Sequence, residues 1–280
     1  MRGFVNVVGF PFDGTACFRK GAADAPTAIR EVSDSLETFS PTLNLDLEDV
    51  QFFDLGDLTV RTQGATQSWA KGTDNYYKLF SMDLAKTNTK TLVLGGEHSV
   101  SVAPIRRALE CFPDLVVVQL DAHADLRDGY QGFHWSHAAV MRRVLDYFGP
   151  KHQLIQHGIR SGTRREFEWM TRNGTRCSSL ESLLTKIYDL PNDRPIYLTL
   201  DLDYFDPGFL PGTGTPEPGG ESFHSFVAVT QTLLRKRLVG ADVTELAPTI
   251  DPTGNSSVLA AKAARELILL LTQPTKRATT

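Results

Sequence analysis

The amino-acid sequence predicts one α/β domain with a mainly parallel central sheet and helices on both faces. Three observations support this fold class. Short apolar segments rich in β-branched residues recur along the chain, and most are continuous rather than alternating, as in strands buried on both faces. Segments with helical periodicity separate several of them, and strands that alternate with helices indicate a parallel sheet. The length of 280 residues suits one large domain or two small ones, and no linker divides it.

The predicted elements alternate along the chain. Ser99 or Ser101 is a candidate N-cap for the first helix, and Gly149 ends the second. The predicted strands are 4–10, 50–56, 91–96, 115–121, 152–160, 196–203 and 238–246. The predicted helices are 101–112, 136–149, 222–236 and 256–271.

We expect one domain over 1–271 and a frayed tail over 272–280. The composition of 41% hydrophobic and 22% charged residues is enough to form a packed core. The segment 203–221 is dense in Gly and Pro and is long for a connection. Loops of that length are usually functional or disordered.

The composition also argues against several classes of partner. The net charge of −4 and the lack of a Lys or Arg cluster argue against a nucleic-acid partner. Three separated cysteines without a CxxC pair indicate neither a disulfide framework nor a thiolate zinc site. We find no signal peptide and no apolar run near the ~18 residues that a membrane helix needs. We therefore expect a cytoplasmic protein without a membrane partner.

Acidic and imidazole side chains follow the strand predicted at 115–121. Asp121, His123 and Asp125 occupy alternate positions, so they project to the same side if the backbone stays extended. They stand at the carboxyl end of the strand, which is the edge where ligands bind in open parallel sheets. The sequence therefore predicts a ligand site there.

Two other predicted strands end in the same way. One ends in Asp201 and Asp203, and another in a Gly-Gly turn that precedes Glu97 and His98. A single aspartate in such a place is usually a helix N-cap, but four clustered carboxylates cannot all stay ionised without cations. Oxygen ligands with two imidazoles suit two Mn²⁺ or similar ions, with open positions for a water of lowered pKa as nucleophile.

These segments resemble the signature regions of the ureohydrolase family, which includes arginases, agmatinases and formimidoylglutamate hydrolases. The resemblance covers most of the chain in the right order, and it is greatest to bacterial agmatinases. The main motifs are GGEHS at 95–99, DAHAD at 121–125, DLD at 201–203 and PGTGTPEPGG at 211–220. Three further segments fit the family, at 14–30, 158–161 and 240–248.

The resemblance implies a three-layer α/β/α sandwich that holds two Mn²⁺ per chain, with Co²⁺ or Ni²⁺ as alternatives. It implies that Asp121 and Asp203 bridge the two ions, and that the assembly is a homotrimer or homohexamer. The implied ligands of one ion are His98, Asp121, Asp125 and Asp203, and those of the other are Asp121, His123, Asp201 and Asp203.

The resemblance also implies three catalytic residues. His137 stands where the family has a histidine implicated in proton transfer, although the residues alone also allow a capping or surface histidine. Glu245 is able to hold a guanidinium with paired hydrogen bonds, whereas an ordinary strand-end acid is the simpler interpretation. Asp125 would stabilise the nucleophile and the tetrahedral intermediate together with the metals.

The loop LRDGYQGFHW at 126–135 bears on the substrate. Phe133 and Trp135 are poor partners for a carboxylate, and Asp128 is an acid able to face a cationic tail. Arg127 is able to bind a carboxylate, unless it pairs with a neighbouring acid. We therefore expect agmatine to be hydrolysed to putrescine and urea, a step of polyamine biosynthesis. The alternatives are an arginase, a guanidino-acid hydrolase, a formimidoylglutamase or a non-catalytic metal-binding protein.

Overall fold

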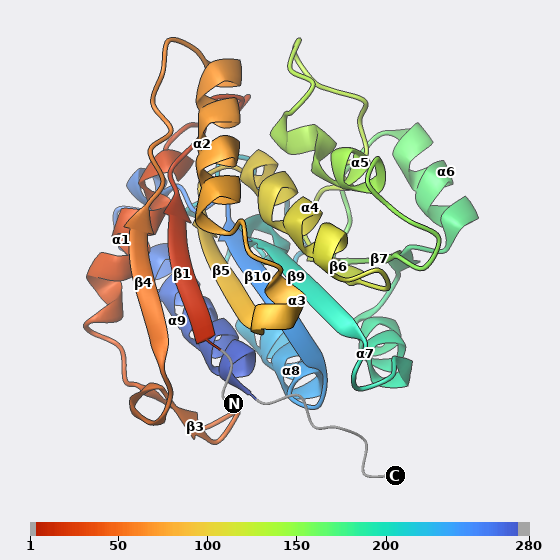
Figure 1. The fold of residues 1–280 in the computed structure, drawn as a ribbon. Helices are drawn as coiled ribbons and strands as arrows, with labels where there is room; N and C mark the ends of the chain where they lie inside the picture. The colour runs from red at the N-terminus through yellow and green to blue at the C-terminus, as the bar shows by residue number, and fades with distance from the viewer. Residues whose placement is uncertain (1–3, 274–280) are drawn as a thin grey trace.

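A computed structural model describes residues 4–273 of the chain. Within that range eight strands form one sheet in the order β4-β1-β5-β10-β9-β6-β7-β8, and every neighbouring pair is parallel (Figure 1). The strands of this sheet are β1 (Phe4–Phe10), β4 (Phe52–Asp57), β5 (Thr89–Gly95), β6 (Val116–Leu120), β7 (Gln153–His157), β8 (Arg176–Cys177), β9 (Pro195–Asp201) and β10 (Arg237–Thr244). A separate antiparallel pair is formed by β2 (Phe39–Ser40) and β3 (Leu45–Asp46).

Helices cover both faces of the sheet, which confirms the expected three layers (Figure 1). Helices α1, α7, α8 and α9 share one hydrophobic core with the sheet, whereas α2, α3, α4 and α5 share another. The helices are α1 (Ala25–Ser33), α2 (Ala65–Leu79), α3 (Leu84–Thr87), α4 (Val102–Cys111), α5 (Val140–Leu145), α6 (Arg164–Asn173), α7 (Leu180–Asp189), α8 (Phe223–Leu233) and α9 (Asn255–Thr272).

Strand β6 shows why the apolar segments are continuous. Val116 and Val118 belong to the core under α7, α8 and α9, whereas Val117 belongs to the core on the opposite face. Every residue of β6 and of β9 is buried. A strand covered on both faces needs apolar side chains at successive positions, because neither face contacts water.

The seven strands expected from the sequence are present, but the helix expected at 136–149 is shorter. A 3-10 turn, η4 (His137–Ala139), precedes α5, which ends at Leu145. Bonds from Tyr147 N to Val144 O and from Phe148 N to Leu145 O tighten the chain into i,i+3 turns instead. Gly149 therefore lies beyond the helix.

The remaining expectations concern the tail and the membrane. Of the tail expected at 272–280, Thr272 ends α9 and Gln273 follows it, and the rest lies outside the described residues. Among residues 4–273, no helix combines the length and the apolar character needed to cross a bilayer. The three cysteines are free.

Four adjacent strands end at one edge of the sheet. The order β5-β10-β9-β6 places the segments that follow Gly95, Thr244, Asp201 and Leu120 beside one another. The register pairs Thr244 with Asp201 and Leu120 with Leu200, so these strands end at nearly the same level. The acids and histidines predicted at separate strand ends therefore share one site.

Candidate metal centre

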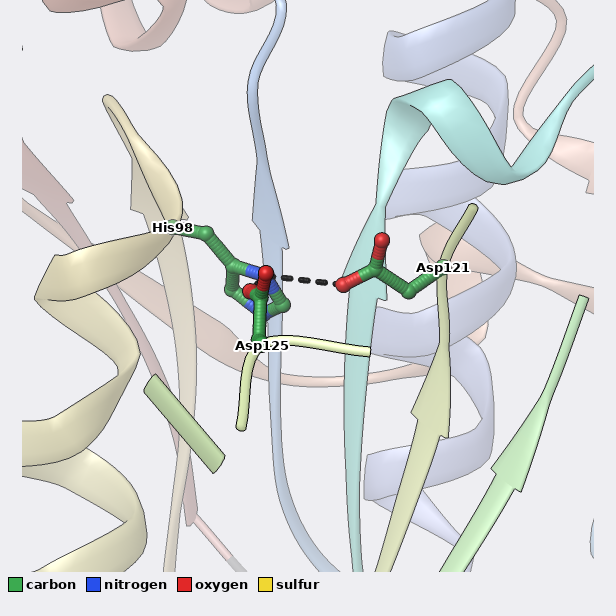
Figure 2. Close-up of side chains that lie close together, drawn as sticks. All are labelled: His98, Asp121 and Asp125. Atoms are coloured by element: carbon green, nitrogen blue, oxygen red, sulfur yellow. Dashed lines mark ion pairs between the residues drawn. The ribbon is translucent and has the colours of Figure 1, made fainter. Parts of the chain in front are cut away.

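The imidazole of His98 points into a group of buried carboxylates. His98 begins the 3-10 turn η3 (His98–Ser101) after β5. Its Nδ1 lies 3.1 Å from Asp121 Oδ2, 3.0 Å from Asp125 Oδ2 and 3.3 Å from Asp201 Oδ2. Figure 2 shows the ring turned toward Asp121 and Asp125. Three carboxylate oxygens around one ring nitrogen require a positive charge at that position.

The other ring nitrogen of His98, Nε2, has a buried hydrogen-bond partner. His98 Nε2 lies 2.8 Å from Thr199 Oγ1, and Thr199 donates its hydroxyl proton to Asp242 Oδ1 at 2.7 Å. Tyr197 donates to the other Asp242 oxygen at 2.9 Å. Because the Thr199 proton is committed to Asp242, its oxygen accepts from His98 Nε2–H. In the neutral ring, Nδ1 is therefore unprotonated and free to bind a cation.

A second group forms around His123. Its Nδ1 lies 2.8 Å from Asp203 Oδ2 and 3.8 Å from Asp121 Oδ1, and its Nε2 lies 3.6 Å from Glu217 Oε1. Asp121 is thus close to both histidines, and two candidate clusters, His98–Asp121–Asp125 and Asp121–His123–Asp203, share it. The structure therefore brings the six expected metal ligands together.

The spacing of two in both acidic motifs has a local cause. His123 N donates to Asp121 Oδ1 at 2.6 Å, and Asp203 N donates to Asp201 Oδ1 at 2.9 Å. Each aspartate thus accepts from the N–H two residues on, which turns the chain at the strand end. The turn brings the second side chain of each motif back toward the first.

The expected common direction of Asp121, His123 and Asp125 is only partly correct. Asp125 has a φ of +54°, in the left-handed region, so the backbone does not stay extended to the end of the motif. His123 consequently faces Asp203, whereas Asp125 faces His98. A change of backbone conformation, rather than strand alternation, separates the two groups.

A buried amide network orients Asp121. Gln119 donates from Nε2 to Asp121 Oδ2 at 2.7 Å, and Gln156 donates to Gln119 Oε1 at 2.7 Å. Thr175 in turn donates to Gln156 Oε1 at 2.8 Å. The single polar residue that interrupts the apolar segment of β6 is therefore a support for a candidate ligand, which the sequence did not reveal.

The electrostatics of the centre fit a bound cation. Burial, and then the charges of Asp125 and Asp203, raise the pKa of Asp121 to about 7. Burial likewise raises the pKa of Asp201 well above its usual range. Although burial opposes it, the charge of Asp203 raises the pKa of His123 to about 11. The buried carboxylates therefore favour positive charge at this site.

The geometry at His98 Nδ1 shows whether a cation fits between this nitrogen and the carboxylates. This nitrogen is buried and has no hydrogen bond of acceptable geometry, although three carboxylate oxygens lie within 3.3 Å. The distances are therefore short while the directions are wrong for a proton donor. A cation between the nitrogen and the oxygens satisfies all of them, and imidazole with carboxylates is a common donor set for Mn²⁺, Co²⁺ or Ni²⁺.

Asp203 and Asp201 lie beside different histidines. Asp203 Oδ2 contacts His123, whereas Asp201 Oδ2 approaches His98. No ion pair joins Asp203 to His98 within residues 4–273. Asp201, which precedes the turn η5 (Leu202–Tyr204), therefore lies nearer to His98, and Asp203 lies nearer to His123.

Glu245 lies beside the candidate metal ligands in a left-handed backbone conformation. Its φ is +66°, and its backbone N donates to Gly96 O at 2.8 Å. Glu245 Oε1 accepts from His98 N at 2.7 Å. Burial, and then the charge of Glu97, raise the pKa of Glu245 to about 8. A cationic partner would therefore stabilise the ionised form of this side chain.

A cavity of about 210 Å³ opens above the centre. His137 lines it, and burial lowers the pKa of this histidine despite the opposing charge of Asp125. Glu245, Asp125, Tyr130 and Glu166 are also among its lining residues. The cavity therefore joins the candidate metal ligands to a space that holds a small molecule.

The structure does not bring Asp128 to this cavity. The Asp128 side chain is 84% exposed and accepts from Arg143 Nη2 at 2.5 Å. Trp135 stacks on Trp69 at 4.7 Å, which places its ring in the core under α2 and α4. Phe133 is likewise not among the lining residues. The structure therefore places none of these three side chains in the lining of the cavity.

Two other charged residues, Arg127 and Glu166, line the cavity instead. The Arg127 guanidinium lies 4.7 Å from the centre of the Tyr130 ring, and its Nε is 4.0 Å from Glu166 Oε2. Glu166 accepts from Leu126 N at 3.0 Å and from Thr163 N at 2.7 Å. In the sequence Glu166 is indistinguishable from an ordinary capping-box residue of α6.

Comparisons with known proteins agree with this geometry. A model of the arginase family matches residues 4–270. The chain is 38% identical to the agmatinase of Bacillus cereus over 271 residues, which cover 95% of this chain and 91% of the relative. A crystal structure from Clostridium difficile has a TM-score of 0.88 and 36% identity, covering 97% of this chain and 98% of that one. The agmatine ureohydrolase of Thermoplasma volcanium has a TM-score of 0.80 and 30% identity, covering 96% and 90%.

Proposed function

Because the chain belongs to the arginase family, we propose that it is a ureohydrolase that cleaves agmatine to putrescine and urea. The observation that carries this proposal is the cluster of four buried aspartates, buried His98 and half-buried His123 beside a cavity that Glu245 also lines. Such a cluster suits hydrolysis of a strong C–N bond, because two-metal centres activate water at neutral pH.

Two divalent ions would be held by six side chains. His98, Asp125 and Asp201 would hold one, His123 and Asp203 the other, and Asp121 would contact both. We propose Mn²⁺, with Co²⁺ or Ni²⁺ as alternatives, because the donors are oxygen and imidazole nitrogen. When bound, the ions would lower the pKa of water and balance the charge of the carboxylates.

The residues around the cavity have separate roles in this proposal. Glu245 uses Oε1 to hold the backbone of His98, so Oε2 is available to bind the guanidinium and aim its carbon at the ions. Asp125 contributes a negative charge next to the attacked carbon, where the guanidinium is positive. His137 donates a proton to the amine nitrogen as the C–N bond breaks.

Glu166 in the cavity lining supports a substrate with a cationic tail. Glu166 is buried, and its carboxylate accepts only backbone N–H groups among hydrogen bonds within residues 4–273. Its nearest cation, Arg127, is 4.0 Å away and stacks on Tyr130. An ammonium group at the end of the substrate would add a direct partner for Glu166.

One observation favours a second candidate function. Arg127 itself lines the cavity, and a guanidinium there is able to bind a carboxylate tail. Under this alternative the substrate is a guanidino acid, arginine or formimidoylglutamate. The charge of Glu166 next to Arg127 opposes a second carboxylate, so agmatine remains the proposed substrate.

Urea and amine release from a panel of substrates tests the proposal. We expect kcat/KM for agmatine to exceed that for arginine by at least about two orders of magnitude. The reason is that the carboxylate in the tail of arginine would lack its partner in the cavity. A guanidino acid or arginine as the best substrate would contradict the assignment of the tail. Loss of that activity in Arg127→Ala would then identify the alternative.

A matched pair of variants isolates the role of Glu166. Glu166→Gln should reduce the preference for agmatine over butylguanidine, whose tail is neutral, by about tenfold or more. Asp128→Asn, outside the cavity, should leave that preference unchanged. The ratio of two substrates is insensitive to partial loss of folded protein, so an unchanged ratio in Glu166→Gln would reject this role.

Family membership also supports a homotrimer or homohexamer, a cytoplasmic location and a place in polyamine biosynthesis, which we include in the proposal. Sedimentation of the purified chain distinguishes the two assemblies.

A further inference from the structure

A second buried chain of hydrogen bonds joins Glu97 to His137 through Thr15. Thr15 Oγ1 makes a short hydrogen bond to Glu97 Oε1, and Thr15 N donates to Glu97 Oε2 at 2.7 Å. The same hydroxyl lies 3.4 Å from His137 Nδ1 and accepts from His137 N at 3.3 Å. Glu97 is completely buried and Thr15 is 4% exposed. Three segments far apart in the chain therefore meet at one hydroxyl.

The backbone holds this contact in place. Glu97 N donates to Phe12 O at 2.7 Å, and Gly96 N donates to Phe10 O at 2.9 Å. A Cβ at Gly96 would lie 2.0 Å from Phe12 O, so only glycine allows the segment with Thr15 to approach so closely. The Thr15 hydroxyl is therefore a fixed point beside His137 rather than the tip of a mobile loop.

The direction of each hydrogen bond follows from the available donors. Ser99 Oγ donates to Glu97 Oε1 at 2.6 Å. Thr15 N and Thr15 Oγ1 also donate to Glu97, so its carboxylate accepts from three donors. The Thr15 hydroxyl has one proton and two lone pairs, and its proton goes to Glu97. Its lone pairs then accept from His137 N and from His137 Nδ1–H.

We propose that Thr15 is a positioning residue that holds His137 in the Nδ1–H tautomer with Nε2 left for the cavity. The inference rests on the proposed function, because it concerns the proton that the leaving amine receives. Within residues 4–273, His137 Nε2 has no hydrogen-bond partner, and His137 lines the cavity. Glu97 and Thr15 thereby orient His137 as Asp242 and Thr199 orient His98, but through the opposite ring nitrogen.

The proton balance of the step suits this arrangement. His137 that has taken up a proton from water in the cavity carries hydrogens on both ring nitrogens. As the C–N bond breaks, the proton on Nε2 moves to the amine nitrogen, and the electron pair of the broken bond becomes the lone pair that receives it. The ring that remains is the neutral Nδ1–H tautomer, which is the form that Thr15 accepts from.

Two substitutions separate the hydroxyl from the shape of the side chain. Thr15→Val keeps the β-branched shape and the backbone N–H but removes the hydroxyl. Thr15→Ser keeps the hydroxyl. We expect kcat to fall about 10- to 100-fold in Thr15→Val, with KM changed less than about threefold, and we expect Thr15→Ser to restore most of the loss. Metal content is measured for each variant and should match the wild type.

The same substitutions in His137→Ala test whether Thr15 acts through the histidine. If it does, Thr15→Val should change kcat by less than about twofold once His137 is gone. An equal loss in both backgrounds, or a Thr15→Ser enzyme as slow as Thr15→Val, would overturn the inference. Crystal structures give an activity-free readout: the His137 ring should keep its place in Thr15→Ser and rotate in Thr15→Val, and an unmoved ring in Thr15→Val with normal kcat overturns it.

Failure of the proposed function is distinguishable from failure of this inference. Wild-type enzyme that releases no urea from agmatine overturns the substrate assignment alone. The substitution cycle is then measured on the best substrate of the panel, where coupling between Thr15 and His137 supports the inference and its absence rejects it.

Discussion

His98 Nε2 lies 2.8 Å from Thr199 Oγ1, and the Thr199 hydroxyl donates a hydrogen bond to the buried Asp242. The relationship determines which nitrogen of His98 faces the carboxylates of Asp121 and Asp125. Support of this kind for a ligating imidazole commonly contributes about 10- to 100-fold to metal affinity. Thr199 is therefore expected to act on the metal without touching it.

Removal of the Thr199 hydroxyl should weaken metal binding. We expect Thr199→Val to raise the Kd for Mn²⁺ by about 10- to 100-fold, because Nε2–H and Asp242 both lose a partner. Calorimetric titration of metal-free protein measures this directly. Thr199→Ser, which keeps the hydroxyl, serves as the control, and an unchanged Kd in Thr199→Val would show that the contact is incidental.

The purified chain should hold two divalent ions, and chelation should abolish urea release. Asp121→Asn should lower the content of both ions, because Asp121 belongs to both candidate clusters. His123→Asn should mainly affect one ion, since His123 is in only one cluster. Elemental analysis of the dialysed variants measures the stoichiometry. Full turnover with one ion per chain would rule out a two-metal mechanism.

Metal binding should weaken as the pH falls. The pKa of His123 is raised to about 11 and that of Asp121 to about 7, so the metal-free site is protonated at these groups. A metal ion must displace those protons, and each displaced proton weakens the apparent affinity about tenfold per unit fall in pH. His123 contributes throughout pH 8 to 6, and Asp121 adds to the slope below about 7. A Kd independent of pH across this window would show that no proton is released.

Glu245→Gln should reduce activity without loss of metal. Glutamine keeps an oxygen to accept from His98 N, but it loses the charge that would pair with a guanidinium. We expect kcat/KM to fall by about two to three orders of magnitude, the effect of removing a charged hydrogen bond to a buried cation. Steady-state kinetics together with elemental analysis distinguish this result from loss of the metals. Nearly normal kcat/KM would assign Glu245 a structural role.

Asp251 should stabilise the fold at neutral pH and not in acid. It accepts from the hydroxyls of Ser256 at 2.6 Å and Thr253 at 2.5 Å, and from the backbone N–H groups of the same residues at 2.8 and 3.0 Å, at the start of α9. Although burial opposes it, these bonds lower the pKa of Asp251 to about 2, below the usual 3.8. Its contribution is therefore complete above pH 3.8 and lost as the pH falls toward 2.

We accordingly expect Asp251→Asn to cost about 1–2 kcal/mol at pH 7, or a fall in Tm of a few degrees. Calorimetric scans of metal-free protein at pH 7 and at successively lower pH measure the difference, which should shrink as acid is added. Asp193→Asn, at an exposed aspartate, is the matched control. A difference that grows in acid would contradict the sign of the shift.

Much of the fold was predictable because its signals are local. Burial on both faces requires apolar residues at successive positions, so β6 and β9 are recognisable in the sequence. Strand β8, with two residues, and helix α6, with its polar surface, carry weaker signals and were not predicted. Helices α1, α2, α3 and α7 were not predicted either. Helix α5 ends early because its last residues form i,i+3 turns, which periodicity alone does not reveal.

Local patterns in the amino-acid sequence were enough to locate the strand ends and the acidic motifs after them, and hence to recognise the family. Residues two apart, such as Asp201 and Asp203, form their turn locally through a single backbone hydrogen bond. The tertiary structure alone decided which distant side chains meet, because such contacts join positions that no local pattern relates. It placed Asp128 on Arg143 and Glu166 in the cavity, and it set Asp201 rather than Asp203 beside His98. It also joined Thr15 to Glu97 and His137, which are 82 and 122 positions away. These contacts form because the loop after β1 packs against the segment that follows β5.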